Sequence, residues 1–296
     1  MVGCAAPDLE GKEQDRALKR MDATGIMVEL NQKPRRIVSL NNATDEILFS
    51  LTSSDNILAV SENSINPNIS FVVDNARLIK YHLPLRTNSE FIYTLQPDLV
   101  LFPETGPIEL VESMRDMGIK VFVVPSATGV EAIEKKILDI ACIIGEMEKG
   151  KQLVSTMTRQ INELAPLRTI GKKQKTVVAF TFYGAYGSKG GLFDDLCRHA
   201  GVINGGATVG LEKGERLSQE QVLAIDPDAI FLPKWSHYKD NDPLKFKEQF
   251  LNDPAYGNLR AVKMGKVYLL DEKYRSCGSQ YVVEGILELH RTVYQK

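Results

Sequence analysis

No stretch of about 18 apolar residues, the length that a membrane-spanning helix needs, occurs in this chain of 296 residues. The chain also lacks a basic excess, because 36 Lys and Arg against 38 Asp and Glu give a formal net charge of −2. A nucleic-acid-binding protein needs cations that displace the counterions of phosphates, so this balance argues against nucleic acid as a partner. The length allows two compact domains.

Cysteine pairs of the C-x-x-C type are missing, which argues against a zinc ribbon or a thioredoxin-type site. Of the four cysteines, Cys142 and Cys197 fall in apolar helical patterns, and we expect both thiols in the core. Cys277 follows the last core strand in a predicted loop. Cys4 is different, because Met1–Cys4 with small residues after it resembles the end of a bacterial lipoprotein signal.

Motifs of covalent catalysis and phosphate binding are also missing. There is no G-x-S-x-G nucleophile elbow, and the glycine-rich loop 182–191 has neither P-loop nor G-x-G-x-x-G spacing. The histidines are scattered: His199 and His290 lie in helical patterns, whereas His82 and His237 lie in predicted loops. Two histidines without a carboxylate cluster do not make a metal site, so they stay weak candidates.

One phrase occurs twice at an offset of 130. Residues 90–103 read EFIYTLQPDLVLFP and residues 220–233 read EQVLAIDPDAIFLP. Each copy predicts a short helix, a Pro-Asp turn and a buried strand. The repetition predicts two similar lobes, and two lobes enclose a cleft.

The elements around each copy alternate strand and helix, which indicates an α/β fold with parallel sheets. A long helical region at 129–166, interrupted by Gly145, includes a stiff connector between the lobes. We therefore predict a tether at 1–23, an N-terminal lobe at 24–145, a connecting helix at 146–167 and a C-terminal lobe at 168–296. In the first lobe we expect Thr44 or Asp45 to cap a helix, and residues 61–89 to be irregular.

Glu90 and Glu220 open the two repeated helices. A carboxylate in a first helical turn is favoured by the helix dipole, so a purely structural role is the alternative. Two separated surface carboxylates, one on each lobe, suit docking onto arginines of a two-fold partner better than acid–base catalysis.

The string RIVSL-x4-TDEILFSL and the phrases E-x6-PDLVLF and E-x6-PDAIFL resemble the class III substrate-binding proteins of bacterial ABC importers, over about residues 24–296. The resemblance implies two Rossmann-like lobes joined by one long helix, with the ligand in the cleft between them. It also implies salt bridges from Glu90 and Glu220 to arginines of the permease dimer. It further implies an extracytoplasmic, monomeric protein without an intrinsic cofactor, lipid-anchored through Cys4.

Members of that family bind iron–siderophores, haem or cobalamin. The predicted loops at the cleft mouth offer a set of aromatic and cationic side chains, namely Tyr81, Arg86, Tyr183, Tyr186, Trp235, Tyr238, Tyr274 and Arg275. Arginines with tyrosines suit an anionic ferric siderophore, through charge-assisted hydrogen bonds and stacking. The single tryptophan argues against a tryptophan-rich cobalamin pocket. Haem, with Tyr81 or His82 as the axial ligand, is the competing ligand.

Two hypotheses from other classes stay open. A two-lobed Rossmann-type enzyme, such as a glycosyltransferase, would need a phosphate cradle and a catalytic acid or base in the cleft. A receptor for a bare metal ion would need more ligands than His82 and His237.

Overall fold

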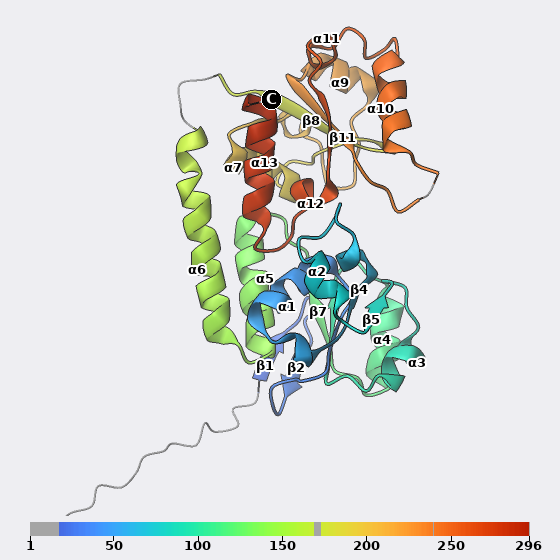
Figure 1. The fold of residues 1–296 in the computed structure, drawn as a ribbon, viewed down its shortest axis with the longest axis vertical. Helices are drawn as coiled ribbons and strands as arrows, with labels where there is room; N and C mark the ends of the chain where they lie inside the picture. The colour runs from blue at the N-terminus through green and yellow to red at the C-terminus, as the bar shows by residue number, and fades with distance from the viewer. Residues whose placement is uncertain (1–17, 169–172, 239, 296) are drawn as a thin grey trace, which may run out of the picture.

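The chain folds into two lobes, one above the other, with a long helix along one side (Figure 1). The computed structural model describes residues 18–168, 173–238 and 240–295. Each lobe is built on its own sheet, and helices cover the sheet faces. This confirms the predicted α/β fold of two lobes with parallel sheets.

The N-terminal lobe contains a parallel sheet of order β5-β4-β3-β6-β7. Its strands are β3 (Ile37–Ser39), β4 (Ile57–Ser61), β5 (Tyr81–Leu83), β6 (Leu99–Pro103) and β7 (Val121–Val124). Its helices are α1 (Asn42–Leu51), α2 (Val73–Arg77), α3 (Ser89–Thr94), α4 (Ile108–Asp116) and α5 (Val130–Ile143). Short continuous apolar runs form the central strands because both sheet faces are buried.

The C-terminal lobe contains a sheet of order β10-β8-β11-β12, with β9 antiparallel to β8. Its strands are β8 (Thr176–Thr181), β9 (Gly184–Tyr186), β10 (Ile203–Asn204), β11 (Ala229–Pro233) and β12 (Val267–Leu270). Its helices are α7 (Leu192–Ala200), α8 (Gly205–Thr208), α9 (Gln219–Ile225), α10 (Pro243–Asn252), α11 (Arg260–Lys263), α12 (Glu272–Arg275) and α13 (Val282–Tyr294). The helix–turn–strand units predicted from the repeated phrase are therefore α3–β6 and α9–β11.

A hairpin of β1 (Leu18–Met21) and β2 (Met27–Leu30) precedes the first sheet. The buried Asp22 carboxylate accepts hydrogen bonds from Thr24, Ile26 and Val123, and Arg115 pairs with it. Residues 18–21 therefore form a strand where we predicted part of the tether. Cys4 lies outside the described residues.

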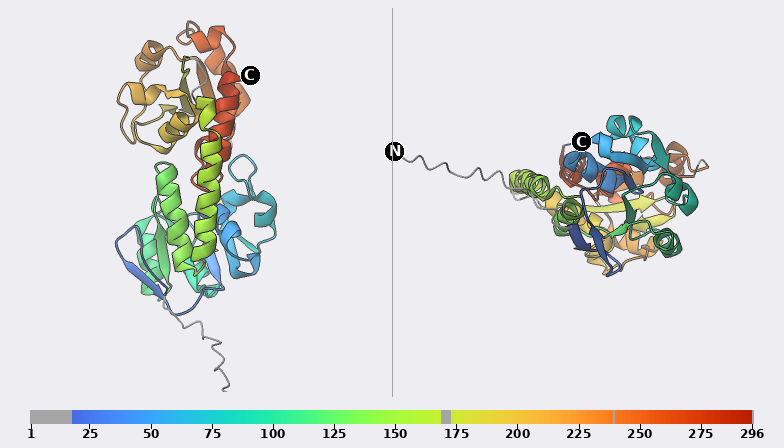
Figure 2. Two further views of the ribbon diagram at one scale, coloured as in Figure 1. Left: turned by 90° about the vertical axis from the view of Figure 1, so that its left-hand side faces the viewer. Right: turned by 90° about the horizontal axis from the view of Figure 1, so that it is seen from below.

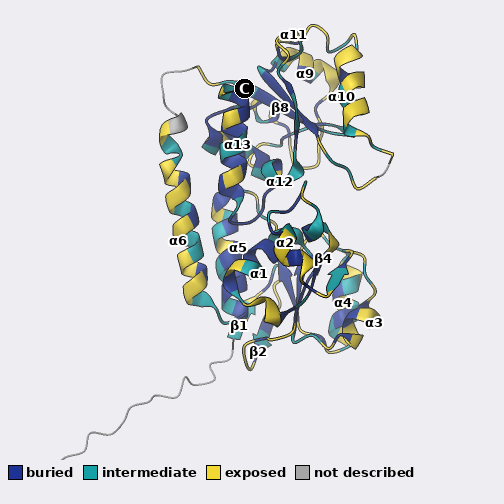
Figure 3. Cartoon of the chain, viewed as in Figure 1, coloured by how far each residue is buried: buried dark blue, intermediate teal, exposed yellow. Residues whose placement is uncertain are grey.

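The connector α6 (Met147–Glu163) runs beside both lobes (Figure 2). Gly145, at φ +74°, ends the preceding helix as predicted. The helix turns its exposed face outward and packs Met157 and Ile161 inward (Figure 3). None of the helices in the described ranges is long and apolar enough to cross a bilayer.

One apolar cluster runs through both lobes. It joins the first sheet to the second by way of α5, α6, α7 and α13, with Phe122, Ile140 and Phe231 among its fully buried members. Each lobe also has a smaller apolar cluster of its own on the outer face of its sheet. The lobes therefore share a core instead of meeting only at a flexible linker.

Three local predictions are wrong. Asn41 caps α1, because its side chain accepts a hydrogen bond from the Thr44 N–H. Residues 61–89 are not irregular throughout, since they contain α2 and β5. Cys142 is only partly buried, with its Sγ 3.7 Å from the Lys19 carbonyl, whereas Cys197 is buried as expected.

Gly150 lies where α6 packs tightly on Ala141 of α5. A Cβ added there would lie 2.4 Å from the Cβ of Ala141. We expect Gly150→Ala to lower the free energy of unfolding by about 1–3 kcal/mol, because overpacking at a rigid helix contact outweighs the higher helix propensity of alanine. Denaturant unfolding measures it, with the exposed neighbour Lys151→Ala as the control. Equal or higher stability of Gly150→Ala would show that the contact is loose.

Candidate functional site

The carboxyl ends of the parallel strands in each lobe point at the other lobe. In the first lobe β6 ends at Pro103 and β7 at Val124, and in the second β8 ends at Thr181 and β11 at Pro233. Ligands of open α/β sheets bind at this edge. The loops that follow these strands therefore line a candidate binding cleft between the lobes.

The larger interlobe cavity has a volume of about 540 Å³. The start of α5 forms one wall, and α7 with Gly190 forms the other. Across it, Asp195 Oδ2 accepts a hydrogen bond from the Val130 N–H at 2.8 Å. A carboxylate of one lobe thus meets the N-terminus of a helix in the other, where the helix dipole favours it.

A smaller interlobe cavity of about 130 Å³ contains the only tryptophan. From the C-terminal lobe it is lined by Trp235, His237, Lys273 and Cys277, and from the N-terminal lobe by Asn42, Glu46, Asn63 and Ile69. The His237 ring packs edge-on against Trp235, with centroids 4.2 Å apart. Lys273 Nζ lies 5.1 Å from the ring centroid of Phe71 and 5.4 Å from that of Tyr274. This part of the cleft therefore combines aromatic and cationic surface.

Lys136 lies at the base of the cleft. Its Nζ donates a 2.9 Å hydrogen bond to the Gly278 carbonyl of the other lobe. It also lines a cavity of about 50 Å³ at the carboxyl ends of β6 and β7, with Asn41, Glu104 and Ser126. Burial lowers the pKa of Lys136 to about 8, although Cys277 and Glu46 favour its charged form.

A buried polar seam on α1 joins the lobes beside Lys136. The Glu46 carboxylate accepts hydrogen bonds from the Ser279 hydroxyl and the Phe71 N–H, and Gln280 Nε2 donates to the Glu46 carbonyl. Burial raises the pKa of Glu46 to about 7, against the opposing effect of these donors and of Lys136. Burial likewise raises the pKa of the adjacent Asp45 to about 7.

The predicted ligand residues divide into two groups. Trp235 lines the smaller cavity, and the exposed Tyr183 and Tyr238 pack edge-on with centroids 6.3 Å apart. Arg86 is exposed in the loop after β5. Tyr274 is half-buried and packs edge-on against Phe71 of the other lobe.

The other predicted ligand residues have structural contacts. Arg275 is 3% exposed, donates to the Phe180 carbonyl and pairs with Glu272. Its guanidinium lies over the Tyr186 ring, which packs against Phe193. These contacts tie β8 and β9 to α12, so the prediction that Arg275 and Tyr186 face the ligand does not fit this arrangement.

Tyr81 and His82 belong to a strand, β5, and not to a loop as predicted. Tyr81 packs edge-on against Phe91 of α3, and His82 Nε2 lies 2.9 Å from the Ala76 carbonyl. Neither lines the two interlobe cavities above. Within the described residues no three His, Cys, Asp or Glu side chains gather as a metal site.

The sequence reasoning missed Lys136, Glu46 and Asp195. Lys136 did carry a signal, because it lies three residues after Ile133 and four before Ile140, on the buried stripe of its helix. A charged residue at such a position requires a specific partner.

Glu90 and Glu220 are both exposed, in the first turns of α3 and α9. Ser218 caps α9 through a reciprocal capping box with Gln221. Hydrogen bonds from its own backbone N–H and from Ser218 lower the pKa of Glu220. In Figure 1, α3 lies in the lower lobe and α9 in the upper lobe, both away from α6.

The fold and the interlobe cleft define a two-lobed binding protein. The family model of the periplasmic binding proteins matches residues 37–274, and the chain belongs to this family. Its class III members are solute-binding proteins of ABC importers, not enzymes, and act outside the cytoplasm.

Particular relatives agree with this assignment. The uncharacterized ABC transporter substrate-binding lipoprotein YvrC of Bacillus subtilis is 24% identical, over 99% of this chain and 93% of its own. The haem-binding protein RhuT of Roseiflexus has the same fold, with a TM-score of 0.75, 21% identity and coverage of 88% of this chain and 98% of its own. The molybdate-binding MolA of Haemophilus influenzae gives a TM-score of 0.73 at 22% identity, covering 94% and 91%.

The buried Glu46 predicts a pH dependence of stability. Its folded-state pKa near 7 exceeds the usual 4.5, so the folded protein keeps a proton that the unfolded chain releases. The stabilising contribution is complete below pH 4.5 and is lost as the pH rises through 7. Lys136, lowered to about 8, is protonated in both states over this window.

We therefore expect Glu46→Gln to flatten the fall in unfolding free energy between pH 5 and pH 7, by on the order of 2 kcal/mol. Asp45 keeps its own contribution of the same sign. Urea unfolding at both pH values measures the difference, with the exposed Glu62→Gln as the control. An unchanged slope would show that the Glu46 carboxylate stays ionised in the folded protein.

Proposed function

We propose that this substrate-binding protein captures a ferric siderophore in the interlobe cleft and delivers it to the permease of an ABC importer. The observation that carries the proposal is the aromatic and cationic wall of the cleft: Trp235 with His237, and Lys273 beside Phe71 and Tyr274. The metal arrives already chelated, and the protein binds the organic complex without catalysis.

The chemistry of the wall supports an anionic organic complex. The Arg216 guanidinium lies 6.0 Å from the ring centroid of Tyr183, and its Nη1 donates to Thr181 at the carboxyl end of β8. Cations held beside aromatic faces bind planar anionic groups by charge and by stacking at once. In this proposal Arg216 and Lys273 take the role that the sequence reasoning gave to Arg275, and Arg86, exposed in the loop after β5, stays a predicted ligand residue.

Haem and corrinoids are the alternative ligands, since RhuT binds haem and a 25% identical relative in Halobacterium salinarum is a cobalamin-binding protein. Two observations favour a siderophore. Tyr81 and His82, the expected axial ligands of haem, have contacts within the first lobe. Trp235 is the only tryptophan.

The proposal includes the docking role of Glu90 and Glu220. Both carboxylates are exposed, one on each lobe, and the shared core fixes their separation. Such exposed charges set orientation and encounter rate more than affinity. Lipidation of Cys4, outside the described residues, would hold the protein at the membrane surface near the permease.

The ligand is tested by titration of intrinsic fluorescence. We expect ferric catecholate or hydroxamate siderophores to quench Trp235, because that side chain lines the cleft. Haemin, cyanocobalamin and molybdate are the comparison ligands. Trp235→Ala should weaken affinity about ten-fold, measured by calorimetry, through loss of an aromatic contact. Binding of haemin or cyanocobalamin alone would reassign the ligand, and binding of none would refute the proposal.

Docking is tested by charge reversal. We expect Glu90→Arg combined with Glu220→Arg to abolish ligand uptake by cells while ligand affinity stays unchanged, because like charges then face the permease arginines. Glu163→Arg, on the exposed face of α6, is the control. Loss of ligand affinity in the double variant would place the two carboxylates in the binding site instead.

A further inference from the structure

A further cavity lies in the C-terminal lobe alone. Its volume is about 310 Å³, and aromatic rings form most of its wall. The residues of this aromatic pocket are Phe180, Phe182, Tyr183, Gly184, Phe246, Gln249, Phe250, Asp253 and Tyr256. None of them lines the two interlobe cavities.

The ring contacts give the pocket fixed walls. Phe250 and Tyr256 stack with centroids 4.5 Å apart, and Phe180 packs edge-on against both. On the other side Phe182 meets Phe246 at 5.0 Å. Because buried neighbours hold these rings, the space between them is preformed, as in sites that receive a side chain or a small ligand.

The rim of the pocket is acidic on the side of α9. Asp253 lines the pocket, and its charge together with that of Glu220 raises the pKa of Tyr256, after the larger effect of burial. The Gln219 side chain also hydrogen-bonds Tyr256. The pocket therefore lies near the first turn of α9, which carries Glu220.

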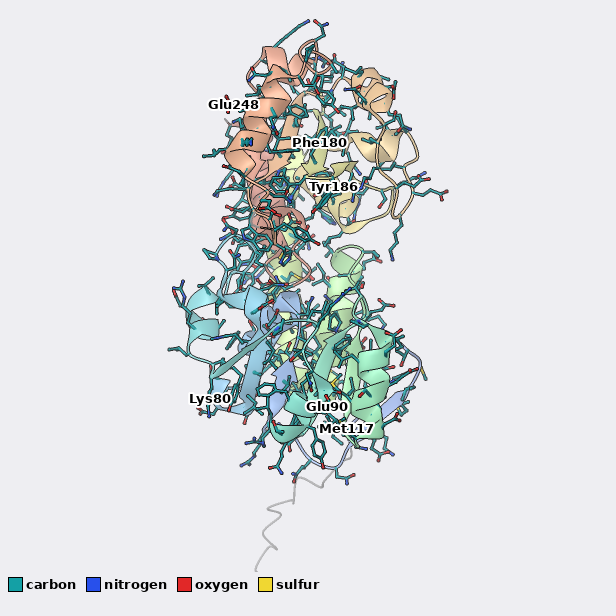
Figure 4. All side chains as sticks on the ribbon, turned by 90° about the vertical axis from the view of Figure 1, so that its right-hand side faces the viewer. Lys80, Glu90, Met117, Phe180, Tyr186 and Glu248 are labelled. Carbon is teal, nitrogen blue, oxygen red and sulfur yellow. The ribbon has the colours of Figure 1, made fainter. Side chains whose placement is uncertain are left out.

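The placement of the helix that lines the pocket agrees with the docking role proposed for Glu220. α10, which supplies one wall, lies on the side of the upper lobe away from α6, and α3 lies on the same side of the lower lobe (Figure 1). Figure 4, viewed from that side, labels Glu90 in one lobe and Phe180 and Glu248 in the other. In the first lobe, Phe91 and Tyr93 are 41% and 56% exposed beside Glu90.

We propose that the aromatic pocket receives a large apolar side chain of the permease, next to the basic residue that pairs with Glu220. This deepens the proposed function and rests on its docking role. The partner segment thus carries a lysine or arginine beside a leucine, methionine or aromatic residue. The apolar contact supplies affinity that exposed ion pairs alone do not give, since interface energy concentrates where side chains fill desolvated pockets.

The test fills the pocket without removing any ring. Gln249 is exposed on α10 and lines the rim, so Gln249→Trp places an indole over or in the space. Gln152→Trp, the same change on the exposed face of α6, is the matched control. Binding is measured against the permease–ATPase complex of the importer in lipid nanodiscs. Ferric siderophore affinity and melting temperature are measured in parallel.

We expect Gln249→Trp to weaken docking ten-fold or more, with siderophore affinity and melting temperature unchanged, and Gln152→Trp to change none of the three. A photo-crosslinking benzoylphenylalanine at position 249, but not at 152, should label a permease subunit. If Glu220→Arg abolishes docking but Gln249→Trp docks fully, the pocket has no role in docking and the inference is wrong. The proposed function is not affected by that result.

Two other outcomes of this experiment would also contradict the inference. If neither Glu220→Arg nor Gln249→Trp weakens docking, both the docking role of Glu220 and that of the aromatic pocket are refuted. If Gln249→Trp weakens siderophore affinity and not docking, the pocket holds an arm of the ligand, and the inference is wrong.

Discussion

The two lobes are held by one continuous apolar cluster with a polar seam at its edge. The cluster passes from the first sheet to the second through α5, α6, α7 and α13. At its edge, Lys136 donates to the Gly278 carbonyl and Ser279 donates to Glu46. Separating the lobes would therefore expose apolar surface and break the interlobe hydrogen bonds of Lys136 and Glu46.

This constraint determines how the cleft can bind. Separating lobes that share a core would expose buried apolar surface, so we expect the ligand to meet walls that are already in place, with little ordering on binding. The contact between Asp195 and the start of α5 holds the far side of the cleft in the same way. Such a frame also keeps Glu90 and Glu220 at one separation, as the proposed docking onto a two-fold permease requires.

The repeated helix–turn–strand units could be predicted from the sequence, whereas the contacts of the segments that do not repeat could not. The two copies of the phrase became α3–β6 and α9–β11 because continuous apolar strands and a Pro-Asp turn admit few other structures. For the segments that the copies do not share, ligand residues were predicted from residue type alone. There the structure shows Arg275 buried in contacts within its own lobe and Tyr81 in strand β5. Long-range contacts decide such cases: the partner of Lys136 is 142 residues away, and that of Glu46 is 233.

The two lobes differ in the segment that follows the repeated strand. After β6 the chain enters α4 through residues 104–107, whereas after β11 it reaches α10 only through the longer segment 234–242. That segment brings Trp235 and His237 to the cleft, and the helix that follows it packs Phe246 against Phe182. Tyr183 connects the two places, because it lines the aromatic pocket and contacts Tyr238 of the same segment. One departure from the repeat therefore supplies Trp235 and His237 to the wall proposed for the ligand and leads into α10, which lines the aromatic pocket. A side chain seated in that pocket would contact Tyr183, which in turn packs against Tyr238 of the segment.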